Sequence, residues 1–207
     1  MYIMKIQFSP YNYSAYKVSN YSTKPTFKGG IPVETIKNCN IGMMPNGLIG
    51  KIKTLKANGE EAFLKVYKHA NYLKELYFIK DDKEQVVGEI ELRIKKALNY
   101  DKTEFTQDPS HVFVETLRNY SNPSTPYYRN GLEEYKGIGT RLLQIAQRRS
   151  DEACCNGNIE LISKLESSDF YFKLGFKNTS LVWGANPHKM YLPPEAKEPL
   201  SRFYGGL

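Results

Sequence analysis

The stretch Tyr135-Lys136-Gly137-Ile138-Gly139-Thr140 decides the fold of this 207-residue chain. Its two glycines come just before an apolar pattern of helical period, which predicts a helix from about Ile138 to the pair Asn156-Gly157. Glycine has no Cβ atom, so the backbone can approach a ligand closely, and the unpaired amides of a helix N-terminus attract anions. The turn therefore predicts a site for a diphosphate.

The turn differs from two common phosphate-binding motifs. No Gly-Lys-Ser/Thr follows at the spacing of a P-loop, and the third glycine of a dinucleotide fingerprint is missing. Two glycines before a helix are by themselves more often a plain turn, so the ligand site needs support from elsewhere in the chain.

Upstream of the turn, the residues from His111 to Arg118 read as a strand. Strict alternation gives this strand two faces, one with Val112, Val114, Thr116 and Arg118, the other with His111, Phe113, Glu115 and Leu117. The strand is followed by a loop over residues 119–136 that contains Pro123, Pro126 and Gly131. Loops of this length are uncommon unless they are functional or mobile.

Further upstream, two hairpins are predicted. Residues 51–56 alternate polar and apolar side chains, Asn58-Gly59 signals a turn, and residues 62–68 form the return strand, with a helix over residues 60–70 as the alternative. The second hairpin joins residues 76–80 to residues 86–94 around a polar turn.

Downstream of the long helix, residues 159–163 read as a short strand. A second helix follows, with Ser167-Ser168-Asp169 as candidate N-caps and Gly175 as the C-terminal cap. Two short strands are expected near residues 180–183 and 189–192. The order of strands and helices predicts an α+β fold with a central mixed sheet flanked by helices.

The first 47 residues differ in composition from the rest of the chain. They are rich in Tyr, Asn, Ser, Pro and Gly and show little periodicity, apart from a possible short helix at residues 33–38. We expect a loosely ordered N-terminal tail over residues 1–47 and one domain over residues 48–207, which ends in a segment rich in Pro and Gly.

Two motifs together resemble a known family. The stretch from Glu134 to Leu143 resembles the acetyl-CoA-binding motif Q/R-x-x-G-x-G/A of the GNAT N-acetyltransferases. Phe170-Tyr171-Phe172-Lys173-Leu174-Gly175-Phe176 resembles the second signature of the family, F-Y-x-K-x-G-F. Both occur in the right order and at a family-like separation, which is much more specific than either motif alone. The resemblance covers about residues 73–192.

The resemblance implies a GNAT-like sheet whose fourth strand, His111–Arg118, splays from its fifth, Ile159–Ser163, with acetyl-CoA in the opening. Backbone near Leu117 and Asn119 would pair with the pantetheine arm. The residues implied to hold the diphosphate are Tyr135, Lys136, Gly137, Ile138, Gly139 and Thr140.

The resemblance also implies two catalytic residues. Tyr171 matches the tyrosine that acts as general acid toward the leaving thiolate, and Glu115 occupies the strand position where many members carry a base. Each residue has a structural alternative: Tyr171 as a packing residue, and Glu115 as an exposed or ion-paired strand glutamate.

Four features depart from the family. Glu134 stands where Gln or Arg is usual, and it puts a negative charge near a bound diphosphate unless it points away or pairs with Lys136 or Arg141. Asn119 replaces an apolar residue, and Lys164 replaces an asparagine. The loop over residues 119–134 is longer than usual, and together with the N-terminal tail it is expected to contribute to the acceptor pocket.

Composition bounds the remaining possibilities. The formal charge of +7 fits an anionic partner, but the lysines are spread along the chain, which makes nucleic acid an unlikely one. The three cysteines have no disulfide or zinc-type spacing and favour a reducing, cytoplasmic compartment. No apolar run is long enough to span a membrane. The histidines His69, His111 and His188 show no metal-ligand spacing.

Three functions remain open on the sequence. The first is transfer of an acetyl group from acetyl-CoA to a primary amine, the identity of which the sequence leaves open. The second is a GNAT-like binding module with little turnover, which Glu134 and the long loop favour. The third is a basic protein associated with nucleic acid, for which only the charge argues. A fold alone does not choose among them.

Overall fold

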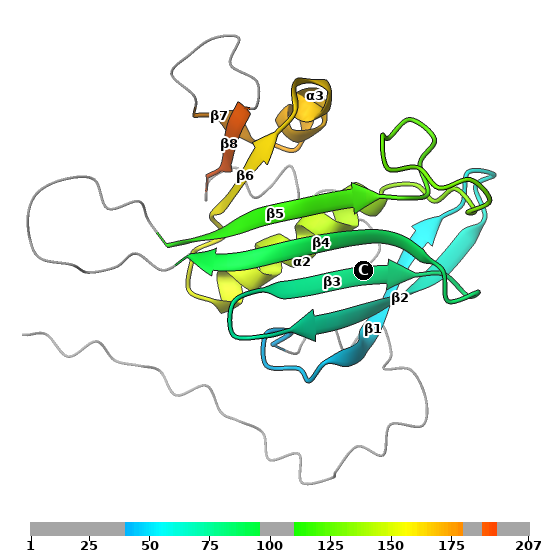
Figure 1. Ribbon diagram of the computed structural model, residues 1–207, viewed down its shortest axis with the longest axis horizontal. Coiled ribbons are helices and arrows are strands. Elements are labelled where there is room, and N and C mark those ends of the chain that lie inside the picture. The colour runs from blue at the N-terminus through cyan, green and yellow to red at the C-terminus, as the bar shows by residue number, and fades with distance from the viewer. Residues whose placement is uncertain (1–39, 96–109, 180–187, 194–207) are drawn as a thin grey trace, which may run out of the picture.

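The computed structural model describes residues 40–95, 110–179 and 188–193, which form one eight-stranded sheet and two helices (Figure 1). In sheet order the strands are β1 (Gly47–Leu55), β2 (Glu61–Ala70), β3 (Glu75–Lys80), β4 (Val86–Lys95), β5 (His111–Asn119), β6 (Ile159–Ser163), β8 (His188–Leu192) and β7 (Lys177–Asn178). The helices are α2 (Ile138–Glu152) and α3 (Leu165–Lys173). The α+β fold class, with a central mixed sheet flanked by helices, is confirmed.

A tight turn at residues 71–74 joins β2 to β3, within an antiparallel ladder of β1 to β5 that also includes the two predicted hairpins, β1–β2 and β3–β4. Gly59 takes a φ of 91° in the turn of the β1–β2 hairpin. In the β3–β4 hairpin, the Asp81 carboxylate accepts the backbone N–H of Lys83 at 3.0 Å and that of Gln85 at 2.8 Å. Both predicted hairpins are confirmed. The helix considered over residues 60–70 is wrong, because side chains there alternate between core and solvent at the strand period of two.

Strands β5 and β6 are parallel and pair over a short length. Val112 pairs with Ile159 and Val114 with Leu161, after which no pairing continues. β5 runs on to Asn119 while β6 turns away from it, as Figure 1 shows. The splayed pair is therefore present, and its strands are the fifth and sixth of this chain rather than the fourth and fifth.

A β-bulge interrupts the pairing of β5 with β4. Glu91 pairs with Thr116 and Leu92 with Val114, so Glu115 has no partner on β4. A bulge of this kind inserts one residue and shifts the alternation of side chains beyond it.

The bulge corrects one prediction about faces. Leu117 pairs with Ile90, which is fully buried, so Leu117 lies on the core face of the sheet. The uninterrupted alternation expected over residues 111–118, with Leu117 on the face of Glu115, is wrong beyond the bulge. The physical reason is the register with β4, since each extra residue exchanges the two faces for the rest of the strand.

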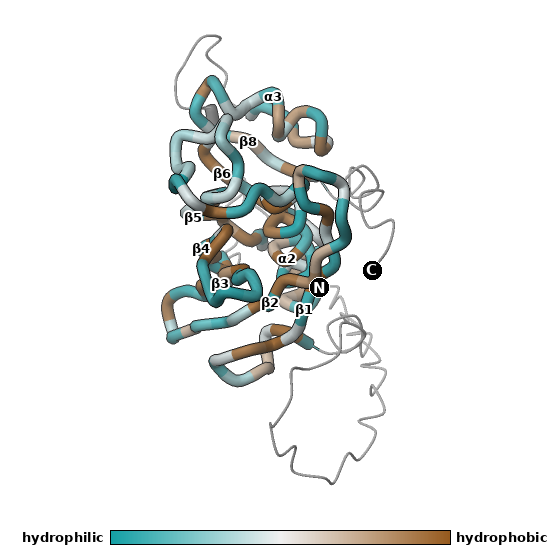
Figure 2. The backbone as a smooth tube through the Cα atoms, turned by 90° about the vertical axis from the view of Figure 1, so that its right-hand side faces the viewer, coloured by the Kyte–Doolittle hydropathy of each residue, from teal (hydrophilic) through white to brown (hydrophobic). Residues whose placement is uncertain are grey.

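Helix α2 covers the core face of the sheet. Ile138 and Leu142 are fully buried, and they belong to one hydrophobic cluster with Tyr77 and Ile90 of the sheet. Hydrophobic stretches, drawn in brown, gather where α2 meets the strands (Figure 2). A Cβ atom at Gly88 would lie 2.5 Å from Ile138 Cγ2, so this glycine allows α2 to approach β4 closely. The start of α2 is thereby fixed against the sheet, where burial of one such side chain contributes about 1.5–3 kcal/mol.

The end of α2 differs from the prediction. The helix ends at Glu152 rather than at Asn156-Gly157. Cys154 adopts a left-handed φ of 58°, and the Cys155 N–H donates to the Ser150 carbonyl at 2.8 Å. These are the features of a Schellman cap, in which the left-handed residue here is a cysteine rather than the usual glycine.

Helix α3 begins one turn before its predicted caps. It starts at Leu165, with Lys164 in the N-cap position, so Ser167-Ser168-Asp169 lies inside the helix. The Ser168 hydroxyl therefore does not cap the helix. It donates back to the Lys164 carbonyl at 3.2 Å, which satisfies it inside the helix. The predicted C-terminal cap is confirmed, since Gly175 follows α3 with a φ of 92°.

The described part of the N-terminal segment packs on the domain. Ile41 is 1% exposed, and the buried Lys68 ammonium donates to the carbonyls of Ile41, Gly42 and Met44 at 3.1, 2.6 and 2.9 Å. Burial lowers the pKa of Lys68. The division of the chain at residue 47 stays a proposal.

Several predictions lie outside the described residues. They are the short helix at residues 33–38, the strand at 180–183 and the segment from 194 onward. The strand predicted at 189–192 is confirmed as β8. Within the described ranges, no helix has the length and apolar character that a membrane crossing requires.

Candidate active site

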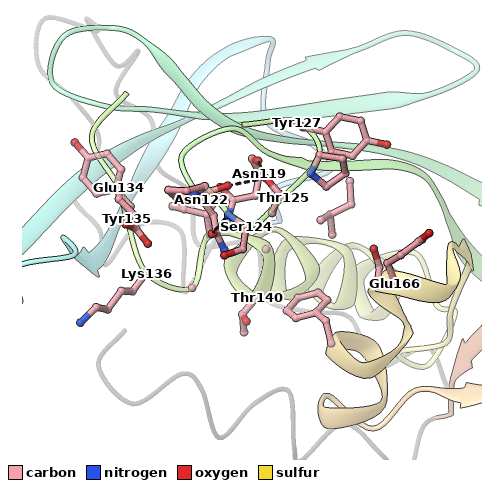
Figure 3. A pocket seen from close by; sticks show the side chains of 18 of the residues that line it. Asn119, Asn122, Ser124, Thr125, Tyr127, Glu134, Tyr135, Lys136, Thr140 and Glu166 are labelled. Carbon is pink, nitrogen blue, oxygen red and sulfur yellow. Dashed lines mark hydrogen bonds between the residues drawn. The ribbon is translucent and has the colours of Figure 1, made fainter. Parts of the chain in front are cut away.

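A cleft of about 890 Å³ lies on the side of the sheet where β5 and β6 separate (Figure 3). Its walls come from the end of β5, the loop 122–127, the turn 134–140 and residues 164–171 at the start of α3. The volume falls within the range of about 300–1,000 Å³ that is usual for small-molecule sites.

The turn before α2 supplies amides to this cleft. Gly137 is the N-cap, with φ 71° and ψ 14°, and the first helical hydrogen bond runs from the Arg141 N–H to the Gly137 carbonyl at 2.9 Å. The backbone amides of residues 137–140 therefore precede the helical ladder, and none has an acceptor among the described residues. We call these four amides the amide cradle. Together with the positive end of the helix dipole, they can hold an anion.

Tyr135 and Lys136 line the cleft in a different way. The Lys136 N–H already donates to the Leu55 carbonyl at 2.8 Å, so its amide is not open to a ligand and its ammonium group is what it can contribute. Tyr135 is 3% exposed, and its hydroxyl donates to the Glu133 carboxylate at 3.0 Å. Burial of this phenol raises its pKa. Of the six diphosphate residues implied by the resemblance, the last four form the amide cradle.

The two sequence motifs meet at Gly139. A Cβ atom at this position would lie 3.1 Å from Phe170 Cζ of α3, closer than ordinary van der Waals contact. The glycine therefore serves the approach of α3 to the first turn of α2. This contact places the amide cradle and Tyr171 in the walls of the same cleft.

Tyr171 is buried at the α3 side of the cleft. Its side chain is 8% exposed, and its ring meets Phe170 and Phe176 edge to face, with centroids 5.1 and 5.5 Å away. Burial, with a smaller contribution from nearby Tyr127, raises the pKa of Tyr171 to about 12. No hydrogen bond to its hydroxyl occurs within the described part of the chain, and the oxygen is not among the fully buried atoms that lack a partner, so it reaches the surface of the cleft. A hydroxyl in this state is available to a ligand.

Glu115 does not line the cleft. Its carboxylate pairs with Arg93 Nε at 2.9 Å on the outer face of the sheet, and its side chain is 29% exposed. The structure thus brings Tyr171 and the amide cradle together but leaves Glu115 apart from them. Its role as a base stays a prediction, and the ion-paired arrangement is the structural alternative considered above.

Leu117 and Asn119 line the cleft beyond the last β5–β6 pair. The Asn119 carbonyl accepts the Thr125 hydroxyl at 2.7 Å. The Asn119 side-chain oxygen accepts the N–H and the hydroxyl of Ser121 at 3.1 and 3.0 Å. Both acceptors of Asn119 are therefore used within the loop, which leaves Leu117 as the better placed of the two for backbone pairing with a ligand.

The long loop forms a wall that the motifs do not identify. The cleft residues that the motifs missed in this loop include Asn122, Ser124, Thr125 and Tyr127, and Glu166 of α3 was missed as well. The length of the loop was the only signal for the four loop residues. The loop is well braced, because the Arg129 guanidinium lies 3.7 Å from the centroid of the Tyr120 ring and the Arg129 N–H donates to the Tyr120 carbonyl at 3.0 Å.

Glu134 is exposed at the cleft beside the amide cradle. No ion pair to it occurs among the described residues, so neither Lys136 nor Arg141 neutralises it there. Its charge opposes a bound anion. Elsewhere in the described ranges, no group of three His, Cys, Asp or Glu side chains is arranged to hold a metal ion.

Comparison with known proteins gives distant likenesses only. No family model matches the chain, and no curated protein matches it. Solved structures that resemble it include a histone acetyltransferase HPA2 and related acetyltransferase from Corynebacterium glutamicum, at 18% identity over 59% of this chain and 66% of that one, with a TM-score of 0.39. A bacterial toxin shares 12% identity over 65% and 74%, with a TM-score of 0.44.

A third likeness is to GCN5 from Tetrahymena, at 16% identity over 60% of this chain and 71% of that one, with a TM-score of 0.35. The chain thus spans just under two thirds of the first of these structures and somewhat more of the other two. All three TM-scores are low, so the functional argument rests on the cleft itself.

Proposed function

We propose that this protein is an acyl-CoA-dependent N-acyltransferase that moves an acetyl group from acetyl-CoA to a primary amine. The observation that carries the proposal is the contact at Gly139, which gives one cleft both the amide cradle and the hydroxyl of the buried Tyr171. The first suits the diphosphate of CoA, and the second suits the thiolate that leaves during transfer.

The proposed reaction needs no nucleophile from the protein. The free amine attacks the thioester carbonyl, a C–N bond forms and the C–S bond breaks. Tyr171 donates its proton to the departing thiolate, and the nitrogen loses one proton to a base or to water. The chain holds the two reactants together, which by itself lowers the barrier of a reaction between two molecules.

The first test is binding. Saturating acetyl-CoA is expected to raise the melting temperature of the full chain, because a ligand at a hundred times its Kd stabilises the folded state by about 2.7 kcal/mol. For a domain of this size the shift is about 5–10 °C. Acetyl-pantetheine, which lacks the diphosphate, should stabilise much less. An equal shift with both compounds, or none with either, contradicts the assignment of the amide cradle.

A second candidate function is a CoA-binding module with little turnover. The pairing of Glu115 with Arg93 favours it, since that ion pair keeps the expected base away from the cleft. Release of free thiol from acetyl-CoA with a panel of primary amines separates the two candidates. The enzyme releases thiol in proportion to acetylated amine, and the binding module releases none.

Nucleic acid is not favoured by the outer face of the sheet. Basic side chains there alternate with glutamates in ion pairs: Lys65 with Glu84, Lys74 with Glu91, Arg93 with Glu115 and Arg118 with Glu89. A platform for phosphate backbones needs a cluster of unpaired positive charge. These four pairs carry no net charge, so they offer no such cluster.

Glu115 can be tested as the base by pH dependence. Its proposed work is to take the ammonium proton, and the need for it falls as pH rises toward the amine pKa and free amine becomes abundant. A Glu115→Gln variant is therefore expected to be slow at low pH and to recover as pH rises, whereas the parent reaches its plateau earlier. The measurement is the rate at saturating acetyl-CoA across the pH range.

The matched control is Glu91→Gln, which removes a glutamate that pairs with Lys74 at 2.6 Å on the same face. It should leave the pH–rate profile unchanged. If Glu115→Gln also gives a profile parallel to that of the parent, Glu115 is a structural ion-pair partner and not the base.

A further inference from the structure

The edge of β1 holds the turn that precedes α2. The Thr54 hydroxyl, on a residue that is 6% exposed, donates a hydrogen bond to the Lys136 carbonyl at 2.6 Å. The Lys136 N–H donates to the Leu55 carbonyl at 2.8 Å, and the Ala57 N–H donates to the Glu134 carbonyl at 2.9 Å. These three hydrogen bonds fix the backbone of the turn to β1 and to Ala57, which follows β1.

The Thr54 hydrogen bond also sets the direction of the next amide. The Lys136 C=O and the Gly137 N–H belong to one planar trans peptide unit, in which the two groups point in opposite directions. Because Thr54 draws the carbonyl toward β1, the Gly137 N–H points away from β1. Gly137 lines the cleft, and its N–H has no acceptor among the described residues. The orientation of this peptide unit therefore decides whether the first amide of the cradle is offered to a ligand.

Gly137 cannot fix that orientation by itself. Its φ of 71° lies in the left-handed region, which glycine occupies about as readily as the right-handed one. Rotation of the peptide unit between Lys136 and Gly137 meets no Cβ atom at Gly137. A rotated unit would present a carbonyl oxygen to the ligand instead of an N–H, and an oxygen repels a diphosphate. An outside contact has to select one orientation.

We propose that Thr54 is a positioning residue for the anion site, because its hydroxyl locks the Lys136–Gly137 peptide unit with the N–H toward the ligand. Its side chain does not line the cleft, so it acts only through the backbone of the turn. The inference rests on the proposed function, since it takes the diphosphate of CoA as the ligand of the amide cradle.

The test compares Thr54→Val, which keeps shape and removes the hydroxyl, with Thr54→Ser, which keeps the hydroxyl. Loss of one oriented hydrogen bond is expected to weaken CoA binding by about tenfold in Thr54→Val, with recovery in Thr54→Ser, as measured by calorimetry. KM for acetyl-CoA should rise by a similar factor while kcat changes little. Thr54→Ala replaces Thr54→Val if the valine variant does not fold.

The matched control is Ile52→Val. Ile52 lies two positions earlier on the same face of β1, is 5% exposed, and belongs to the core cluster. Its truncation lowers stability without touching the turn, so CoA affinity should stay at the parental value. A second readout needs no ligand: the Gly137 amide signal in the NMR spectrum of the free protein should move in Thr54→Val and not in Ile52→Val.

The outcomes separate the two proposals. Parental CoA affinity in Thr54→Val, or an equal loss in Thr54→Val and Ile52→Val, overturns the positioning role alone. A parent protein with no affinity for CoA overturns the proposed function, and the role of Thr54 toward CoA falls with it, whatever the Gly137 signal does. Tenfold loss in Thr54→Val with recovery in Thr54→Ser supports both.

Discussion

A Gly139→Asp variant is expected to bind acetyl-CoA about a hundredfold more weakly than the parent, because it places a carboxylate beside a bound diphosphate. Two such charges about 4 Å apart near a surface repel by up to about 4 kcal/mol, which covers the predicted loss. The new Cβ atom would also lie 3.1 Å from Phe170 Cζ and would push α3 away from the first turn of α2. Calorimetry with acetyl-CoA measures the loss.

Two further variants divide the effect into its parts. Gly139→Ala adds the steric contact without the charge and should cost much less affinity. Gly131→Asp adds the same charge in the loop that precedes α2, at an exposed position where a Cβ atom meets nothing within 4 Å, and should leave affinity unchanged. Its φ of 86° is one that aspartate tolerates better than most residues. Parental affinity in a folded Gly139→Asp protein would remove the amide cradle from the site.

The local part of this site was predictable from the sequence. The Gly137–Gly139 turn, the helix after it and the cap at Gly175 depend on residues close together in the chain. The glycine spacing and the apolar period that predict them can be read from residues within about one helical turn of each position. The fold class followed from the order of such local elements.

The rest depended on register and on distant partners. The bulge at Glu115 arises from the pairing with β4, and no pattern within residues 111–118 specifies it. Thr54 contacts Lys136 across 82 positions of sequence, so its role is invisible without the fold. Cys154 ends α2 in a conformation that cysteine rarely takes, which is why the glycine at 157 was the better guess from propensity.

The same reasoning explains why the ion pair of Glu115 could not be predicted from the sequence. A glutamate in the middle of a strand carries no local sign of its partner, and in the structure that partner is Arg93 of β4. An ion pair on a partly exposed sheet face contributes little to stability, roughly 0–1 kcal/mol, so it can open at modest cost. The ion pair therefore weakens the hypothesis that Glu115 is the base, and the pH–rate experiment with Glu115→Gln decides it.

Tyr171→Phe is expected to lower kcat by about a hundredfold or more while leaving the affinity for acetyl-CoA near that of the parent. The substitution removes only the hydroxyl, and the ring keeps its edge-to-face contacts with Phe170 and Phe176. No described residue loses a hydrogen bond, because the hydroxyl has no partner among them. Steady-state rates with an amine that the parent acetylates, together with calorimetry for acetyl-CoA, make the measurement.

Tyr127 and Tyr128 provide the controls for this loss. Tyr127 lines the cleft and is the nearby phenol that helps raise the pKa of Tyr171, whereas Tyr128 is not among the cleft residues. Tyr128→Phe should behave as the parent. If Tyr127→Phe loses the rate and Tyr171→Phe does not, the proton comes from the loop, and Tyr171 is a packing residue.

The pH profile adds an independent check on Tyr171. Its pKa is raised to about 12, so the phenol stays protonated across the ordinary assay range. The upward shift favours the protonated phenol, which is the form that can donate a proton. The parent rate should therefore show no fall up to about pH 10 from loss of this proton, since fewer than about one phenol in a hundred is ionised there. The same raised pKa makes the phenol a weaker acid than a thiol, whose pKa is about 8.5, so full proton transfer to the thiolate is uphill unless the pKa of Tyr171 falls when acetyl-CoA binds. A decline with a midpoint well below pH 10 that disappears in Tyr171→Phe would show that a lower pKa operates in the complex.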